Sequence, residues 1–169
     1  MKKLFALMLA LCLMLCSAAL ADDMVWEGAV AELASQFEGE FVTFDDIAVK
    51  IWIPAEFKAV ELTDEDKQNG YIGYFAKDEQ TAIAVVYANV EGMSLEDYQA
   101  NVAELDGVSE IEPGTVNGLP CLSYKSNGNG SLAFTTQMGY ILEITYGPLE
   151  GNDVPTEVAC AFASIQAAE

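Results

Sequence analysis

The chain has 169 residues and a net charge of −20, with 27 Asp and Glu against 7 Lys and Arg and no His. A chain of this length builds one domain with a proper core, and its charge disfavours nucleic acids and anionic membrane surfaces, which are bound through Lys and Arg. The absence of His excludes a His-based catalytic triad and a zinc site with His ligands.

The first segment has the three parts of a secretory signal peptide. Two lysines form a basic start, an apolar run follows over 4–16, and Ala19-Leu20-Ala21 is an A-x-A cleavage site. The apolar run is too short to cross a bilayer, which takes about 20 residues. Leu precedes both cysteines of the run, where lipid attachment requires a small residue, so we expect release. The sequence predicts cleavage between Ala21 and Asp22, a secreted or cell-envelope location and no membrane insertion of the mature chain, whose net charge is −22.

The mature chain begins with a predicted amphipathic helix, near 24–37 within an N-terminal unit of residues 22–39. Apolar residues recur there at spacings of four, three and four, which places them on one face of a helix: Trp26, Val30, Leu33 and Phe37. We expect residues 40–169 to form a single α+β domain, because no repeat or linker divides them.

Four strands are predicted in the first half of this domain, each from a run of apolar and β-branched residues: 41–44, 47–53, 71–76 and 81–90. The strand over 81–90 is apolar at both odd and even positions, so we expect it at the centre of a sheet covered on both sides. The stretch 63–70 is the most polar of the chain and is expected to be a loop or a short exposed turn of helix.

A second helix is predicted over 94–106, with Ser94 as its N-cap and acidic residues in its first turn. The chain then alternates apolar runs with turn signals typical of hairpins: Asn117-Gly118, Asn127-Gly128-Asn129-Gly130 and Met138-Gly139. A third helix, capped by Asp153, is predicted over 154–166. Hairpins combined with a few helices indicate an α+β fold, with a mostly antiparallel sheet flanked by helices.

Short motifs between about residues 40 and 166 resemble those of the PsbP-like domain family. They are the aliphatic-Pro-x-x-aromatic start, the helix after the first meander, the second-meander hairpin and the closing helix: Ile51-Trp52-Ile53-Pro54 with Phe57, Ser94-Leu95-Glu96-Asp97-Tyr98, Val116-Asn117-Gly118-Leu119-Pro120 and Ala163-Ser164-Ile165. The resemblance implies an α/β/α sandwich and a non-enzymatic binding or assembly role. Metal sites of the family use His, so it implies no cofactor or metal ligand here. A cystatin-like or NTF-like cone is the alternative fold, since it also starts with a helix and continues as a meander.

The mature chain has two cysteines, Cys121 on a predicted strand and Cys160 on the last predicted helix. In an exported protein this number suggests a disulfide, and closing a loop of about 40 residues would contribute roughly 4 kcal/mol. The alternative is that both act as small hydrophobic side chains, because Cys160 lies off the apolar stripe of its helix. A catalytic thiol is disfavoured, since neither His nor Arg is present to lower its pKa.

One acidic stretch resembles a calcium loop in composition. Asp64, Glu65, Asp66 and Asn69 place four oxygen-bearing side chains within six residues. The EF-hand spacing fails, because glycine falls at position seven instead of six and Phe75 stands at position twelve, where the motif has Glu. We therefore expect a solvated acidic loop.

The sequence contains no catalytic motif, such as G-x-S-x-G or a glycine-rich phosphate loop. It predicts an exported, non-catalytic binding or assembly module of the cell exterior, without a cofactor, whose partner is an extracellular protein or a small ligand. Two alternatives remain. One is a carboxylate-based extracellular hydrolase, because among 27 acids some pair lies at a suitable separation. The other is a calcium-dependent binding module.

Overall fold

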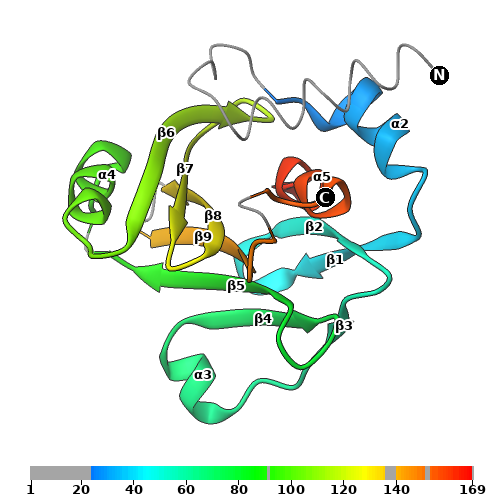
Figure 1. The fold of residues 1–169 in the computed structure, drawn as a ribbon, viewed down its shortest axis with the longest axis horizontal. Coiled ribbons are helices and arrows are strands. Elements are labelled where there is room, and N and C mark those ends of the chain that lie inside the picture. Colours follow the sequence, from blue (N-terminus) through cyan, green and yellow to red (C-terminus); the bar gives the residue numbers. More distant parts are fainter. Residues whose placement is uncertain (1–23, 91, 136–139, 151–152, 169) are drawn as a thin grey trace.

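The computed structural model describes residues 24–90, 92–135, 140–150 and 153–168. Its largest element is a seven-stranded sheet, in which all neighbouring strands run antiparallel, in the order β3-β4-β5-β9-β8-β7-β6 (Figure 1). The strands have these bounds: β3 Lys58–Ala59, β4 Tyr71–Ala76, β5 Ala82–Asn89, β6 Val108–Val116, β7 Leu119–Ser126, β8 Asn129–Thr135 and β9 Tyr140–Gly147. The prediction of a mostly antiparallel α+β fold is confirmed.

A second, smaller sheet packs beside a helix on one face of the large one. Its strands are β1 (Gly39–Phe44), β2 (Val49–Pro54) and β10 (Gln166–Ala167), in the order β1-β2-β10. Helix α5 (Thr156–Ala163) contacts β2 and shares a hydrophobic core with it and with the large sheet. The other face packs against α4 (Leu95–Ala103), which contacts β6 and β7. The large sheet therefore lies between two layers (Figure 1).

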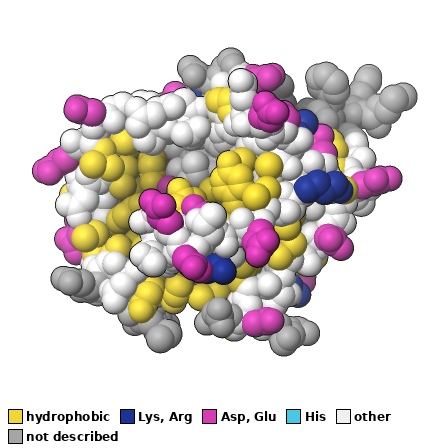
Figure 2. Space-filling model, turned by 90° about the horizontal axis from the view of Figure 1, so that it is seen from below, with side chains coloured by type: hydrophobic (Ala, Val, Ile, Leu, Met, Phe, Trp, Pro, Cys, Tyr) yellow, Lys and Arg dark blue, Asp and Glu magenta, His cyan; other side chains and the backbone are white. Residues whose placement is uncertain are grey.

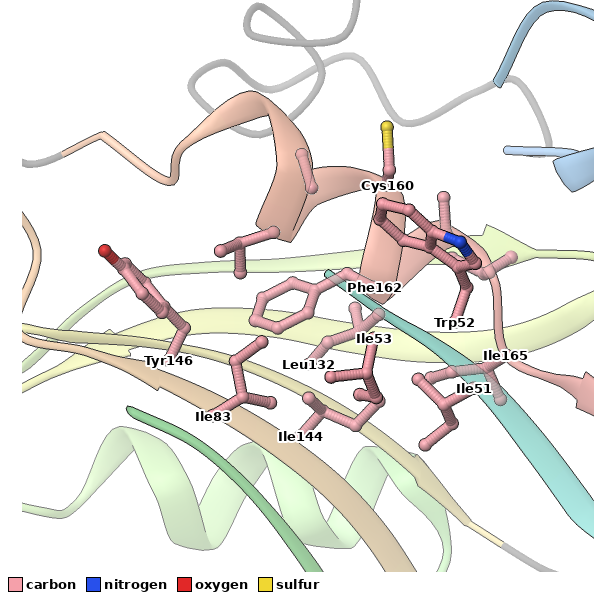
Figure 3. Packing of buried hydrophobic residues seen from close by; sticks show 14 of the residues in the cluster. Ile51, Trp52, Ile53, Ile83, Leu132, Ile144, Tyr146, Cys160, Phe162 and Ile165 are labelled. Carbon is pink, nitrogen blue, oxygen red and sulfur yellow. The ribbon is translucent and has the colours of Figure 1, made fainter. Parts of the chain in front are cut away.

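The two cores follow from the alternation of side chains along each strand. On β9, Leu142 and Ile144 point into the core beneath α5, whereas Ile141 belongs to the core beneath α4. Figure 3 shows Phe162 of α5 among residues of the large sheet and Ile53 of β2. This arrangement fixes the position of the β1-β2 hairpin, because one face of β2 is buried in the core.

The helix predicted over 24–37 is wrong in its extent. Met24 is extended and pairs with Val116, and the segment that follows, η1 (Trp26–Val30), has non-helical backbone angles at Glu27 and Gly28. Regular helix is confined to α2 (Ala31–Ala34). The physical reason is local, since Gly28 adopts φ +81°, a conformation outside the helical region that glycine adopts readily.

Strand β5 is central in the large sheet, but the prediction that both its faces are covered is wrong. Ile83 and Val85 are fully buried on the α5 side. On the opposite side Ala82, Ala84 and Val86 are only half-buried, because α4 packs mainly against β6 and β7.

The polar stretch 63–70 contains the short exposed helix α3 (Asp64–Gln68), in agreement with the second of the two expected forms. Helix α5 starts later than predicted, with Pro155 rather than Asp153 at its N-cap. Residues 1–23, including the predicted cleavage site between Ala21 and Asp22, lie outside the described residues, as does Met138-Gly139. None of the helices formed by the described residues has the length and apolar character that crossing a membrane requires.

Candidate functional site

The two cysteines are both buried, at 1% exposure for Cys121 and 0% for Cys160. The structure has both as thiols, and their pairing after export stays a prediction. Figure 3 shows the Cys160 sulfur pointing away from Phe162 and the residues beneath it. Burial, with a smaller contribution from the charge of Glu157, raises the pKa of the Cys160 thiol to about 12. At neutral pH this thiol stays protonated and is a poor nucleophile.

The acidic stretch predicted to be a solvated loop uses its side chains to start a helix. The Asp66 carboxylate accepts hydrogen bonds from the Thr63 backbone N–H and hydroxyl, at 2.8 and 2.7 Å, and Thr63 Oγ1 accepts from the Asp66 N–H. These bonds form a capping box and lower the pKa of Asp66. Among the described residues, no group of three or more His, Cys, Asp and Glu is arranged to hold a metal ion.

A hollow lies around the turn that joins β2 to β3. It has two adjoining parts, of about 600 and 370 Å³, which share Pro54, Ala55 and Lys58 in their walls. We call the two parts together the acidic groove. Besides the three shared residues, it is lined by Gln36, Phe37, Glu38, Gly39, Glu40, Val42, Ile53, Glu56, Phe57, Ala59, Phe75 and Glu157. Volumes of this order are typical of ligand sites.

The acidic groove has an apolar floor and a negative rim. Phe57 and Phe75 are buried beneath it, at 4% and 5% exposure. Four carboxylates line it against one lysine: Glu38, Glu40, Glu56 and Glu157, with Lys58. Carboxylates outnumber lysines in this groove, and the protein as a whole is strongly negative. Both the local and the overall electrostatic potential therefore favour the binding of a cation there.

One of these carboxylates already has a partner. The Lys77 ammonium lies 2.8 Å from Glu56 Oε1, and both side chains are 40% exposed. This hydrogen bond raises the pKa of Lys77. No such ion pair involves Glu38, Glu40 or Glu157 within the part of the chain that the structure describes. Figure 2 shows that acidic side chains with few lysines, and hydrophobic side chains between them, also characterise the surface seen from below.

A second polar group of side chains lies on the α4 side of the large sheet. The Tyr98 hydroxyl donates to Glu143 Oε2 at 2.8 Å, and the Thr145 hydroxyl donates to Oε1 at 3.0 Å. Burial, followed by the Glu143 charge, raises the pKa of Tyr98 to about 12, and the same causes raise the pKa of Tyr124. Both tyrosines therefore stay protonated at neutral pH. Since both oxygens of Glu143 are used within the fold, we interpret this group as part of the packing of α4.

The acidic groove could not be identified from the sequence. Glu38 and Glu40 flank the start of β1, Glu56 lies in the turn after β2, and Glu157 lies about a hundred residues later on α5. Nothing in the sequence around any of these four acids marks it as part of a site, and only the packing of α5 beside β2 brings them to one hollow. No regular spacing along the chain links them.

Comparison with known proteins shows that the fold is similar to that of solved structures. No family model and no curated protein matches the chain. The structure is similar to the solution structure of cyanobacterial PsbP (CyanoP) from Synechocystis sp. PCC 6803, with a TM-score of 0.51 and 12% identity over 76% of this chain and 92% of that one. It is also similar to the Saccharomyces cerevisiae Ran-binding protein Mog1p, with a TM-score of 0.48 and 12% identity over 79% and 97%.

The likeness to cyanobacterial PsbP confirms the predicted PsbP-like α+β fold. The alternative fold, a cystatin-like or NTF-like cone, shares with this chain only the order in which a first helix is followed by a meander of strands. At 12% identity the likeness concerns the fold and does not transfer a ligand or an activity.

Proposed function

We propose that the protein is an exported, non-catalytic binding module whose acidic groove binds a cationic ligand. The observation that carries the proposal is the lining of the groove, in which four carboxylates surround an apolar floor and only one lysine contributes positive charge. Export is supported by the signal-peptide pattern that ends at Ala21. A net charge of −22 on the mature chain increases the rate at which cationic partners are captured.

A carboxylate-based hydrolase is supported less well. Such an enzyme needs a general acid whose pKa is raised by burial. The pKa values of Asp66 and Asp78 are shifted downwards by hydrogen bonds from neighbouring residues, and both carboxyl groups are exposed. Neither lies in the acidic groove. A binding role therefore fits the acidic groove better than catalysis, because binding a cation needs no carboxyl group with a raised pKa.

Tetralysine amide is a suitable probe of the proposal, with tetraglutamate as its negative counterpart. We expect tetralysine to bind and tetraglutamate not to bind in isothermal titration calorimetry at low salt, with weaker binding as salt screens the charges. The double variant Glu38→Gln/Glu40→Gln should weaken tetralysine binding by about fivefold, since two exposed ion pairs contribute about 0.5 kcal/mol each.

A matched control separates the groove from the general negative field. Glu96→Gln/Glu104→Gln removes the same two charges from exposed positions at α4, on the opposite side of the large sheet. We expect this variant to bind tetralysine within twofold of the unaltered protein. Equal losses in the two double variants would mean that the groove is not the binding site.

A further inference from the structure

We propose that β1 accepts an extended basic segment of a partner protein as an additional strand, so that the segment lies along the open edge of the small sheet and directs its lysines into the acidic groove. This inference rests on the proposed function, because it names the kind of ligand that the groove takes. Three features of β1 support it: the direction of its backbone hydrogen bonds, its contrast with the other sheet edges and the charge beside it.

The hydrogen-bond phase of β1 follows from its pairing with β2. The Ala55 N–H donates to the Glu38 carbonyl at 2.8 Å, and the register continues as Glu40 opposite Ile53 and Val42 opposite Ile51. In an antiparallel pair, alternate residues exchange bonds with the neighbouring strand. The even-numbered residues of β1 therefore bond to β2, and the backbone groups of three odd-numbered residues face outwards: Gly39, Phe41 and Thr43.

The phase is confirmed from the other side of β2. The Ala168 N–H donates to the Ala48 carbonyl at 2.8 Å, and Gln166 pairs with Lys50. Even-numbered residues of β2 thus bond to β10, which leaves its odd-numbered residues for β1. No described strand occupies the outer side of β1, which is the end strand of its sheet.

Other sheet edges of the described structure are protected, whereas β1 is not. The long edge strand β6 contains Pro113, a register shift between Ser109 and Glu112, and a pairing with Met24 at its end. Both β3 and β10 have only two residues. Strand β1 has six residues in continuous register, without proline or a bulge. Proteins protect long regular edges against unwanted pairing, so an unprotected one suits a partner strand.

The side chains of β1 determine what such a strand should contain. Glu40 and Val42 line the acidic groove, and Phe41, on the opposite face, is 39% exposed and contacts Trp26 at 5.4 Å between ring centroids. In an added strand, residues on the groove side meet carboxylates and those on the other side meet an aromatic ring. Opposite charges on neighbouring strands stabilise the pair, so we expect Lys or Arg at alternate positions and uncharged residues between them.

A second copy of this chain is a poor occupant of the same edge. Two β1 strands placed side by side would bring two sets of groove carboxylates together, in molecules that each have a net charge of −22 after cleavage. Like charges directly opposite one another destabilise strand pairing. The occupant that the charges favour is therefore a basic segment of a different protein.

The test uses three fluorescein-labelled peptides and the purified protein. The first peptide is Lys-Thr-Lys-Val-Lys-Thr-Lys; the second has the same sequence with N-methyl groups on alternate backbone nitrogens, on the side that faces β1; the third has Glu in place of Lys. Strand addition requires backbone donors, whereas attraction to the groove requires only charge. In fluorescence anisotropy we expect the first peptide to bind, the N-methylated peptide to bind at least tenfold more weakly, and the Glu peptide not to bind.

Matched protein variants test the same edge. Thr43→Pro removes an outward N–H and fills its place with the proline ring, without removing a bond to β2, and edge positions of this kind accept proline. Thr43→Ala keeps the N–H. We expect at least a fivefold loss of affinity for the Lys peptide in Thr43→Pro and less than a twofold change in Thr43→Ala. A thermal melt checks that both variants fold.

The outcomes distinguish this inference from the proposed function. If the N-methylated and unmodified Lys peptides bind equally, strand addition is refuted while a cation-binding groove stands. If neither Lys peptide nor tetralysine binds, the proposed function fails as well. If sedimentation shows a dimer that Thr43→Pro dissociates, the edge pairs copies of this chain, and the basic partner is refuted.

Discussion

Replacing Asn117 by Gly tests how the N-terminal segment is attached to the fold. Asn117 Oδ1 accepts from the Trp26 N–H at 2.6 Å, and Nδ2 donates to the carbonyls of Ala163 and Ile165, at 2.9 and 2.7 Å. One side chain thus connects the start of the described chain, the β6-β7 hairpin and the end of α5. Glycine tolerates the backbone φ of +50° at this position, so Asn117→Gly removes the three hydrogen bonds without straining the turn.

The expected loss is about 3 kcal/mol of unfolding free energy, at about 1 kcal/mol for each partly buried hydrogen bond. Asn127→Gly is the matched control, because Asn127 also has φ +50°, also precedes a glycine in a hairpin, and is exposed with one side-chain bond of 3.3 Å to Ser126. We expect the control to lose about 1 kcal/mol or less. Urea unfolding followed by circular dichroism measures both variants. Equal losses would refute the role assigned to the Asn117 side chain.

Three further predictions concern buried groups. The buried N–H of Trp52 donates to Ser164 Oγ at 2.7 Å. Ser164→Ala leaves this N–H without an acceptor and should lower the free energy of unfolding, measured in urea, by about 2 kcal/mol; a change below 0.5 kcal/mol would contradict this. Stability should fall as pH rises from about 10 to 12, since unfolded Tyr98 loses its proton near pH 10 and folded Tyr98 only near 12. Because Tyr98 is only partly buried and solvent screens its surroundings, Tyr98→Phe should remove about 1 kcal/mol of that fall between pH 9 and 11.5; an unchanged pH profile would refute the assignment. In the reduced protein Cys160, buried and with a raised pKa, should react with Ellman's reagent only after unfolding; rapid reaction of the native protein would show that the thiol is accessible.

Local sequence signals predicted most of the large sheet. The Asn-Gly pairs at 117–118 and 127–128 join β6 to β7 and β7 to β8 as expected, because the positive φ that these turns require restricts the choice of residues. The prediction for α4 was also good, and the Ser94 hydroxyl and the Asp97 carboxylate form its capping box. Such features depend on neighbouring residues and can be predicted from a short window.

The errors arose where contacts distant in sequence determine the outcome. The apolar spacing from Trp26 onwards favoured a helix, but the Trp26 N–H instead donates to Asn117, 91 residues away. The half-exposed face of β5 depends on where α4 is placed, which no pattern within 81–90 encodes. The acidic groove has the same origin, since its carboxylates come from separate segments. Sequence patterns therefore predict the strands better than the surface that the strands create.

Amide hydrogen exchange along β1, measured by NMR with and without the Lys-Thr-Lys-Val-Lys-Thr-Lys peptide, tests the central claim most directly. In the free protein we predict rapid exchange at Phe41 and Thr43, whose N–H groups face outwards, and slow exchange at Val42, which bonds to β2. The peptide should slow exchange at Phe41 and Thr43 by at least tenfold and shift the resonances of Glu40 in the acidic groove. Unchanged exchange at Phe41 and Thr43 with saturating peptide would contradict strand addition, and unchanged resonances throughout the groove would contradict the binding site itself.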